Sequence, residues 1–223
     1  MEVIRDQNWL LSLGTFLPLA GVLVMLLIPK KEELLHKQVA LVTALATLAV
    51  GVYTLTQFDY DRSASLQFYA DTEWIEVIRS GYTIGLDGIS LPLYILSMII
   101  TVLVMIYSWN HIPSPGNPKA FLILMLVLQT GMAGTFIAQD LILFFVFFEV
   151  VLLPMYFMIG VWGGEQRQYA SLKFFLYTMF GSALMLVAFL AVFYKTGAES
   201  FSIPYLIENG GAINKTTAVW IFA

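Results

Sequence analysis

Cysteine is absent from this chain of 223 residues, and charged residues are scarce. Without cysteine the chain can form no disulfide, and it can bind neither an iron–sulfur cluster nor a zinc ion through thiolates. Charged residues make up 12% of the sequence, against about 25% in an ordinary soluble domain. The net charge of −4 argues against nucleic acid as a partner.

The motifs of nucleotide and metal sites are missing as well. The sequence contains no G-x-G-x-x-G, no G-x-x-x-x-G-K-[ST] and no H-E-x-x-H. Its two histidines, His36 and His111, fall in predicted loops, where neither has a partner at metal-ligand spacing. We therefore expect no cofactor and no metal in this chain.

Hydrophobic residues make up 59% of the sequence and occur in blocks of about 20 residues. A helix of that length crosses a hydrocarbon layer of roughly 30 Å, so the pattern predicts an all-α, polytopic transmembrane helix bundle. We predict six complete spans, at residues 9–28, 38–58, 89–109, 119–138, 140–162 and 169–194. A seventh apolar run begins at residue 216 and stops at Ala223, so the chain reads as a fragment of a longer protein.

The longest polar segment between spans covers residues 59–87. Its partial alternation of apolar and polar residues predicts a short hairpin on the membrane surface. Asp87 at its end is expected to cap the helix that follows, where the helix dipole favours a negative side chain.

Lysine and arginine are divided almost equally between the two membrane faces. We call the face that holds the N-terminus side one and the opposite face side two. The side-two cations sit in short loops, which weigh most in the positive-inside rule, so side two is predicted to be cytoplasmic and the N-terminus external. These cations are Lys30, Lys31, Lys37, Lys119 and Arg167.

Glu149 is the residue around which the functional hypothesis is built. It lies near the middle of the fifth span, DLILFFVFFEVVLLPMYFMIGVW, which carries no other charge beyond Asp140 at its start. An ionised side chain at that depth costs about 2.5–3.5 kcal/mol, so membrane carboxylates usually face protein or water and handle protons or ions. A structural glutamate that is hydrogen-bonded to a neighbouring helix is the alternative.

Two further residues are candidates. Pro154, five residues after Glu149, has no N–H to give to the carbonyl of Val150, and this distortion could hold a water or could be a packing kink only. Lys173 enters the sixth span about 12 Å nearer to side two than Glu149. A direct ion pair is therefore not expected, and a water-mediated link or a lysine that reaches the surface fits better.

Lone polar residues occur in the third and fourth spans. Five hydroxyl residues share one face of the third span, namely Ser90, Tyr94, Ser97, Thr101 and Ser108. Helix packing explains such a face better than a wet path does, because small and hydroxyl residues are common at membrane helix contacts. Gln129 and Thr130 in the fourth span are interpreted in the same way.

Three stretches carry a resemblance to a known family: GLDGISLPL, DLILFFVFFEVVLLPMYFMIGVWGG and YASLKFFLYT. They resemble the antiporter-like membrane subunits of proton-pumping NADH:quinone oxidoreductase (complex I), and chain M most of all. The resemblance implies a longer subunit with two inverted repeats, with residues 1–118 as an N-terminal three-helix region and residues 119–223 as the start of the first repeat. Glu149 falls on the family's functional glutamate, and Lys173 on a lysine of its sixth helix. The family's lysine partner of that glutamate would lie beyond Ala223.

The resemblance also implies the setting. NADH, FMN, iron–sulfur clusters and quinone would be bound by partner subunits, and the chain would contact other membrane subunits, including neighbouring antiporter-like ones. The bacterial plasma membrane is the expected location, with thylakoid or organellar membranes as alternatives. Two other functions stay open: the D-type subunit of a multi-subunit sodium/proton antiporter, and a structural membrane subunit without a pathway of its own.

Overall fold

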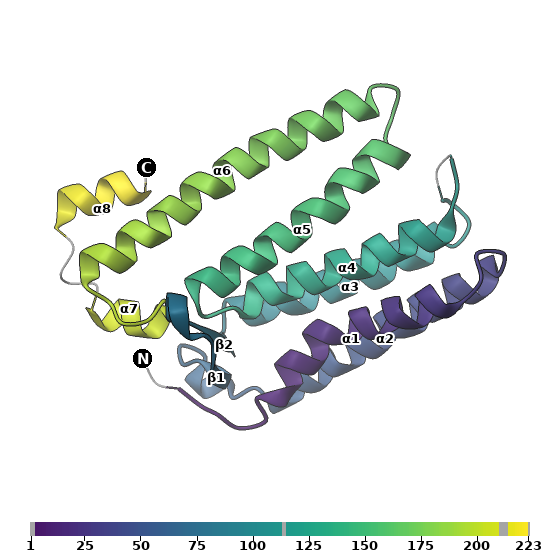
Figure 1. Ribbon diagram of the computed structural model, residues 1–223. Coiled ribbons are helices and arrows are strands. Elements are labelled where there is room, and N and C mark those ends of the chain that lie inside the picture. Colours follow the sequence, from purple (N-terminus) through teal and green to yellow (C-terminus); the bar gives the residue numbers. More distant parts are fainter. Residues whose placement is uncertain (1–2, 113–114, 210–213, 223) are drawn as a thin grey trace.

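The computed structural model describes residues 3–112, 115–209 and 214–222. Within them, six helices are long and apolar enough to cross a membrane, which confirms the six predicted spans (Figure 1). These are α1 (Trp9–Leu27), α2 (Glu33–Gln57), α3 (Ser90–Ser108), α4 (Pro118–Ile137), α5 (Leu141–Trp162) and α6 (Arg167–Thr196). A short helix, α7 (Ile203–Asn209), was not predicted, and α8 (Lys215–Phe222) forms where the seventh apolar run was expected to begin.

The start of α2 differs from the prediction and moves His36 out of a loop. The helix begins at Glu33, five residues earlier than expected, so His36 lies in its first turns and is fully buried. Its Nε2 atom is 3.1 Å from the carbonyl oxygen of Pro29. Charges near this boundary did not end the helix, because an acidic residue in the first turn is favoured by the helix dipole.

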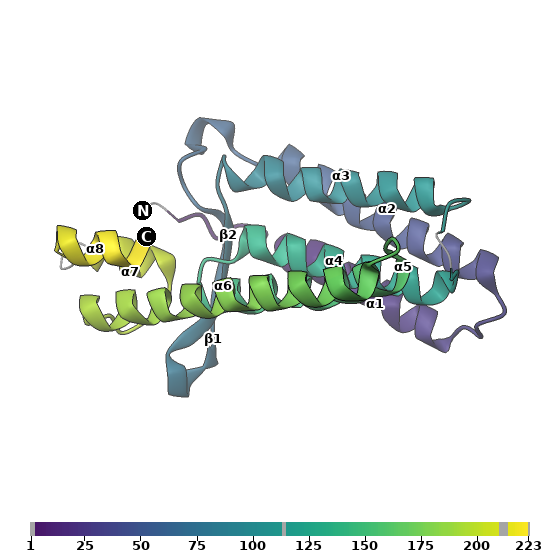
Figure 2. The same cartoon turned by 90° about the horizontal axis from the view of Figure 1, so that it is seen from above.

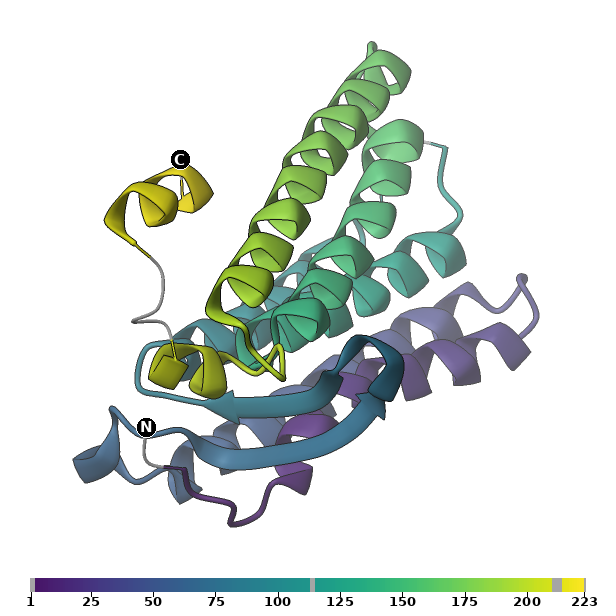
Figure 3. The same ribbon diagram turned by 60° about the vertical axis from the view of Figure 1, so that its left-hand side comes forward.

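The connections gather at the two ends of the bundle. One end, side one, carries the N-terminal segment, a β-hairpin and α7, whereas the α1–α2, α3–α4 and α5–α6 connections lie at the other end, side two (Figures 1 and 3). Seen from above, the hairpin crosses the bundle end at a steep angle to the helices (Figure 2). This arrangement places α5 and α6 at one edge of the bundle, outside α1–α4.

The structure confirms a hairpin within residues 59–87, and its position on the membrane surface stays a prediction. After the 3₁₀ turn η1 (Tyr60–Arg62), strand β1 (Gln67–Ile75) pairs antiparallel with β2 (Ser80–Leu86), and η2 (Glu76–Ile78) joins them. The N-terminal segment adds to it, since Ile4 N–H donates to Leu66 at 2.8 Å and Ile4 accepts from Tyr69 N–H at 2.9 Å. Asp87 caps the next helix as expected, accepting from Ser90 N–H at 2.7 Å.

Helices α1–α4 enclose two apolar clusters, one toward each end. The side-one cluster includes Leu10, Leu11, Tyr94, Met98, Ala133 and Ile137. The side-two cluster includes Val22, Met25, Ala44, Val102, Leu122 and Leu126. Both draw on several helices, and α4 packs against α1, α2 and α3 as well as α5. The division at residue 118 stays a prediction, because α4 contacts both parts.

Two lysines donate hydrogen bonds to carbonyl groups at the side-two ends of neighbouring helices. Lys119 at the start of α4 donates to the carbonyls of Ile28 at 2.7 Å and Leu26 at 3.1 Å, at the end of α1. Lys37 in α2 donates to the carbonyl of Trp109 after α3, at 2.7 Å. The last carbonyls of a helix have no N–H partner and carry partial negative charge, so these lysines stabilise the helix ends.

Candidate functional site

The helix that carries Glu149 is fixed at its start by Asp140. This carboxylate is fully buried and accepts from the backbone N–H groups of Ile142 at 2.9 Å and Leu143 at 3.0 Å. It also accepts from Ser80 Oγ at 2.9 Å and from Gly81 N–H at 3.3 Å, both in β2. The Asp140 side chain therefore accepts hydrogen bonds from N–H groups of the first turn of α5 and also links this turn to the hairpin.

Close contact with α4 fixes the rotation of α5. A Cβ atom added to Gly131 would lie 2.7 Å from Val151 Cγ2, and one added to Gly134 would overlap the ring of Phe147. Glycine lets two membrane helices approach at such points. Phe147 and Val151 therefore face α4, and Glu149, 200° from Phe147 at 100° per residue, faces away from it.

Glu149 is partly buried, at the ninth position of the 22-residue helix. Its Oε1 atom is buried and has no hydrogen-bond partner among the described residues. Leu153, one turn further along the same face, is 53% exposed, so the described residues leave this face partly uncovered. The carboxyl group thus lies at mid-depth, turned into the protein and free to form further polar contacts.

Pro154 is buried inside α5, and the helix continues on both sides of it. Because proline has no N–H, the carbonyl of Val150 lacks its helical donor one residue from Glu149. A polar acceptor therefore lies beside the acid, as predicted from the sequence. Whether it holds water stays a prediction.

Helix α6 runs antiparallel to α5, and its residues can be matched in height to Glu149. Gly160 lies against Ser171, and the rings of Tyr156 and Phe175 are 5.2 Å apart. This register places Ser182 level with Glu149. Ser182 is buried, and its Oγ donates to the carbonyl of Met179 at 3.1 Å. Ser182 was not predicted as a site residue, because one serine in an apolar helix stands out only once the register is known.

Lys173 is not brought to Glu149. It is exposed, its Nζ lies 5.6 Å from the ring centroid of Tyr169, and no described residue forms an ion pair with it. By the register it lies about nine residues of α5 from Glu149, or roughly 13 Å at 1.5 Å per residue. A direct ion pair would need the two side chains to span this separation.

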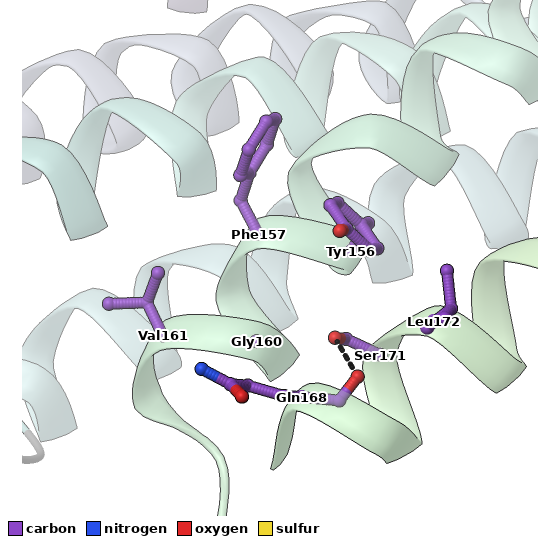
Figure 4. A pocket seen from close by; sticks show the side chains of 7 residues that line it. All are labelled: Tyr156, Phe157, Gly160, Val161, Gln168, Ser171 and Leu172. Carbon is purple, nitrogen blue, oxygen red and sulfur yellow. Dashed lines mark hydrogen bonds between the residues drawn. The ribbon is translucent and has the colours of Figure 1, made fainter.

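A pocket of about 370 Å³ opens where α5 and α6 meet near side two (Figure 4). It is lined by Tyr156, Phe157, Gly160, Val161, Gln168, Ser171 and Leu172. In it, Ser171 Oγ donates to the carbonyl of Gln168 at 3.0 Å. Tyr156 and Gly160 follow Glu149 by seven and eleven residues and so share its face of α5. The pocket therefore lies along the same helix–helix seam as the acid.

The hydroxyl face of α3 turns inward, as packing predicts. Ser97, Thr101 and Ser108 are buried. Ser97 Oγ donates to the carbonyl of Tyr94 at 2.7 Å, and Thr101 Oγ1 to that of Ser97 at 2.8 Å.

In the part of the chain that the structure describes, no group of three or more His, Asp or Glu side chains could hold a metal ion.

Comparison with known proteins identifies the family. Residues 13–135, more than half of the chain, match the family described as NADH-ubiquinone oxidoreductase chain 4, amino terminus. The chain belongs to this family. Residues 138–223 match a second family description, the transmembrane region of NADH:quinone oxidoreductase and Mrp antiporter subunits. These matches confirm the resemblance drawn from the three sequence stretches.

Relatives of the chain 4 family carry related names. The chain is 39% identical over 209 residues to NADH-quinone oxidoreductase subunit M of Rhodobacter capsulatus, covering 89% of this chain and 40% of that protein. It is 36% identical over 168 residues to F(420)H(2) dehydrogenase subunit M of Methanosarcina mazei, covering 74% and 33%. The chain therefore spans about a third to two fifths of the length of these relatives.

Solved structures show the same fold. A chain of respiratory complex I from Thermus thermophilus superposes with a TM-score of 0.80 at 24% identity, covering 95% of this chain and 41% of that one. A chain of the Mrp complex from Dietzia sp. gives a TM-score of 0.77 at 18% identity, covering 95% and 22%. The six-helix arrangement is thus a fold that antiporter-like membrane subunits share, and it accounts for less than half of each of these chains.

Proposed function

We propose that the protein to which this chain belongs is the membrane subunit of an NADH:quinone oxidoreductase that translocates protons, and that Glu149 carries the proton. The observation that supports this most is the buried, unpartnered Oε1 atom of Glu149 at the middle of α5. A carboxylate held there without hydrogen bonds is unfavourable as a purely structural element, whereas one that exchanges a proton needs such freedom.

The seam between α5 and α6 offers the proton a route from side two. On α5, Gly160, Tyr156 and Glu149 lie in one line from the pocket toward the membrane middle. On α6, Ser171, Thr178 and Ser182 occur at intervals of seven and four residues and so share a face, with Ser171 and Ser182 buried. Hydroxyl groups can pass protons through water between them. Lys173 lies 200° from Ser171 around α6 and is exposed, so it faces away from this seam and would assist only through groups outside the described residues.

Electron transfer is assigned to other subunits. NADH, FMN, iron–sulfur clusters and quinone would be bound there, and this chain would contribute proton movement alone. The electron donor is a property of those partners, since relatives with similar identity are named for NADH-quinone oxidoreductase and for F(420)H(2) dehydrogenase. Other membrane subunits, including neighbouring antiporter-like ones, are the expected partners within the bilayer.

The bacterial plasma membrane is the location that we propose, with side two in the cytoplasm and the N-terminus outside. Five cations at side two support this orientation. Lys30 and Lys31 lie in the α1–α2 connection, and Lys37, Lys119 and Arg167 lie in the first turns of α2, α4 and α6. Three of these five cations also close helix ends: Lys37, Lys119 and Arg167, whose Nη1 atom donates to the carbonyl of Val161 at 2.8 Å.

A sodium/proton antiporter subunit is the second candidate function. The fold similarity to the Mrp complex and the shared family description for residues 138–223 favour it. The match of residues 13–135 to chain 4 and the names of the curated relatives favour the oxidoreductase instead. A structural subunit with no pathway is the third candidate.

Purification of the full-length protein with its natural partners distinguishes these functions. A tag on the protein should recover an assembly that oxidises NADH with a quinone and acidifies or alkalises closed vesicles during turnover. An assembly that lacks this activity and exchanges sodium for protons in response to an imposed pH gradient would contradict the proposal and identify an antiporter.

A further inference from the structure

Four fully buried side chains of α1–α4 have a polar atom without a hydrogen-bond partner among the described residues. One of them, His36, lies in the first turns of α2 at the side-two end. The other three are Thr15 of α1, Tyr94 of α3 and Gln129 of α4, each 0% exposed. For Gln129 both the amide nitrogen and the amide oxygen are unpartnered. The Tyr94 hydroxyl lies beside that of Thr15, yet the two do not form a hydrogen bond of normal geometry. We call these three residues the polar layer.

Gln129 and Thr15 of the polar layer lie between the two apolar clusters, whereas Tyr94 belongs to the side-one cluster. Gln129 follows Leu126 of the side-two cluster by three residues and precedes Ala133 of the side-one cluster by four. It therefore shares a face of α4 with both. Thr15 lies four residues after Leu11 of the side-one cluster and seven before Val22 of the side-two cluster. Apolar side chains thus lie above and below Gln129 and Thr15.

The layer is separate from the site at Glu149. Gly131 of α4 meets α5, and Gln129 lies 200° from it around the helix, which turns its amide away from α5 and toward α1–α3. No Asp or Glu occurs in α1, α3 or α4, and the one in α2, Glu33, is exposed in the first turn. A cationic ligand would therefore find no carboxylate as counter-ion in this core.

The unpartnered atoms require a ligand that both donates and accepts. A glutamine amide offers two donors and two acceptor lone pairs, and each buried group left unpaired costs about 1–3 kcal/mol. Pro18 of α1 gives no N–H to the carbonyl of Gly14, so this carbonyl is a further acceptor in α1. The Tyr94 hydroxyl lies where a Cβ atom of Gly14 would be, on the Cα side of that residue. Water meets both demands, forming about three hydrogen bonds per buried molecule.

We propose that the polar layer is a closed water site, in which Gln129 binds at least one water molecule within the α1–α4 core. A neutral ligand fits because the layer holds no charge, and the apolar clusters separate it from both membrane faces. The site would hold α1, α3 and α4 in register and would form no part of the transport route.

A high-resolution structure of the native assembly tests this, with the wild-type protein, Gln129→Met and the matched variant Leu126→Met, which changes a fully buried neighbour on the same face. In maps that resolve other internal waters, density should lie about 3 Å from the Gln129 amide in the wild type and in Leu126→Met, and should be lost in Gln129→Met. A wild-type map with resolved waters elsewhere and none at Gln129 overturns the proposal. So does density that persists in Gln129→Met.

Transport measurements on the same variants test whether the site is closed. Ion transport per turnover should change less than about twofold in Gln129→Met when assembly is normal. A larger loss would place the layer on a transport route and overturn that part of the proposal. If Gln129→Met does not assemble, the wild-type map alone decides.

Discussion

Ser80 of the β-hairpin donates its hydroxyl hydrogen to Asp140 at the start of α5, over 2.9 Å and away from solvent. The same connection between α4 and α5 binds the chain after α6, since Leu141 N–H donates to Phe201 at 3.1 Å and Ile203 N–H donates to Gln139 at 2.7 Å. Hydrogen bonds at the α4–α5 connection therefore join three segments: the hairpin, the helix that carries Glu149, and the segment before α7.

Asp140→Ala should destabilise the protein by about 2–4 kcal/mol, because it removes a helix cap and leaves the N–H groups of α5 and the Ser80 hydroxyl without their acceptor. Asp140→Asn should be milder, since one acceptor oxygen is kept. Thermal unfolding of the purified full-length protein measures both. Equal stability of the wild type and Asp140→Ala would show that the hydrogen bonds of Asp140 contribute nothing to the stability of the fold.

Gly134→Ala should disturb the contact between α4 and α5. The added methyl group would overlap the ring of Phe147, which is itself buried, so a loss of about 1–3 kcal/mol is expected. Gly181→Ala in α6 is the control, because no described atom lies within 4 Å of its added methyl group. Melting temperatures that fall equally in the two variants would contradict the close-contact account.

Lys119→Met should lower stability by about 1 kcal/mol or more, because two carbonyls at the end of α1 lose a charged donor. Lys30→Met serves as the control, since Lys30 is exposed on the same membrane face and has no hydrogen bond in the described part of the chain. Thermal melts in low salt measure the difference. The account predicts that Lys30→Met stays close to the wild type and that Lys119→Met does not.

The free energy of unfolding should fall at alkaline pH because Tyr82 ionises. This residue lies in β2, outside the membrane spans. Burial raises the pKa of Tyr82 above its usual 10.0, and its hydroxyl is 2.9 Å from that of Ser12. The folded protein thus favours the neutral phenol, and stability is lost as the pH rises past about 10, by up to about 1.4 kcal/mol per pH unit. Melts between about pH 9 and 11 should show a smaller loss in Tyr82→Phe than in the wild type; an identical slope would exclude this role.

The helices were predictable because each span holds about 20 apolar residues between polar connections, which membrane thickness requires. The hairpin was predictable from alternation. The seven-residue α7 was not, since it is too short and too mixed in character to show a period. His36 was misplaced because the predicted span begins at residue 38, where the apolar block starts, whereas the helix begins at Glu33 and includes charged residues in its first turn.

The candidate site was predictable only in part. Glu149 and Pro154 stand out within their own span, so their positions followed from the sequence. The faces they present did not, because these depend on Gly131 and Gly134 of another helix. Ser182 and Gln129 are ordinary polar residues in sequence, and only the packing shows that one lies level with Glu149 and that the other is sealed in the core. Contacts such as Lys119 with Ile28 join residues too distant in the chain for any local pattern to reveal.

Protons translocated per electron by the full-length assembly, with Glu149 replaced by Gln, give the most direct test of the central claim. Glutamine keeps the size and polarity of the side chain but cannot carry a proton. The account predicts that Glu149→Gln assembles normally and loses proton translocation through this subunit, while Glu149→Asp, which keeps a carboxyl group, retains part of it. Normal assembly with an unchanged ratio of protons to electrons in Glu149→Gln would contradict the account and leave this chain a structural role.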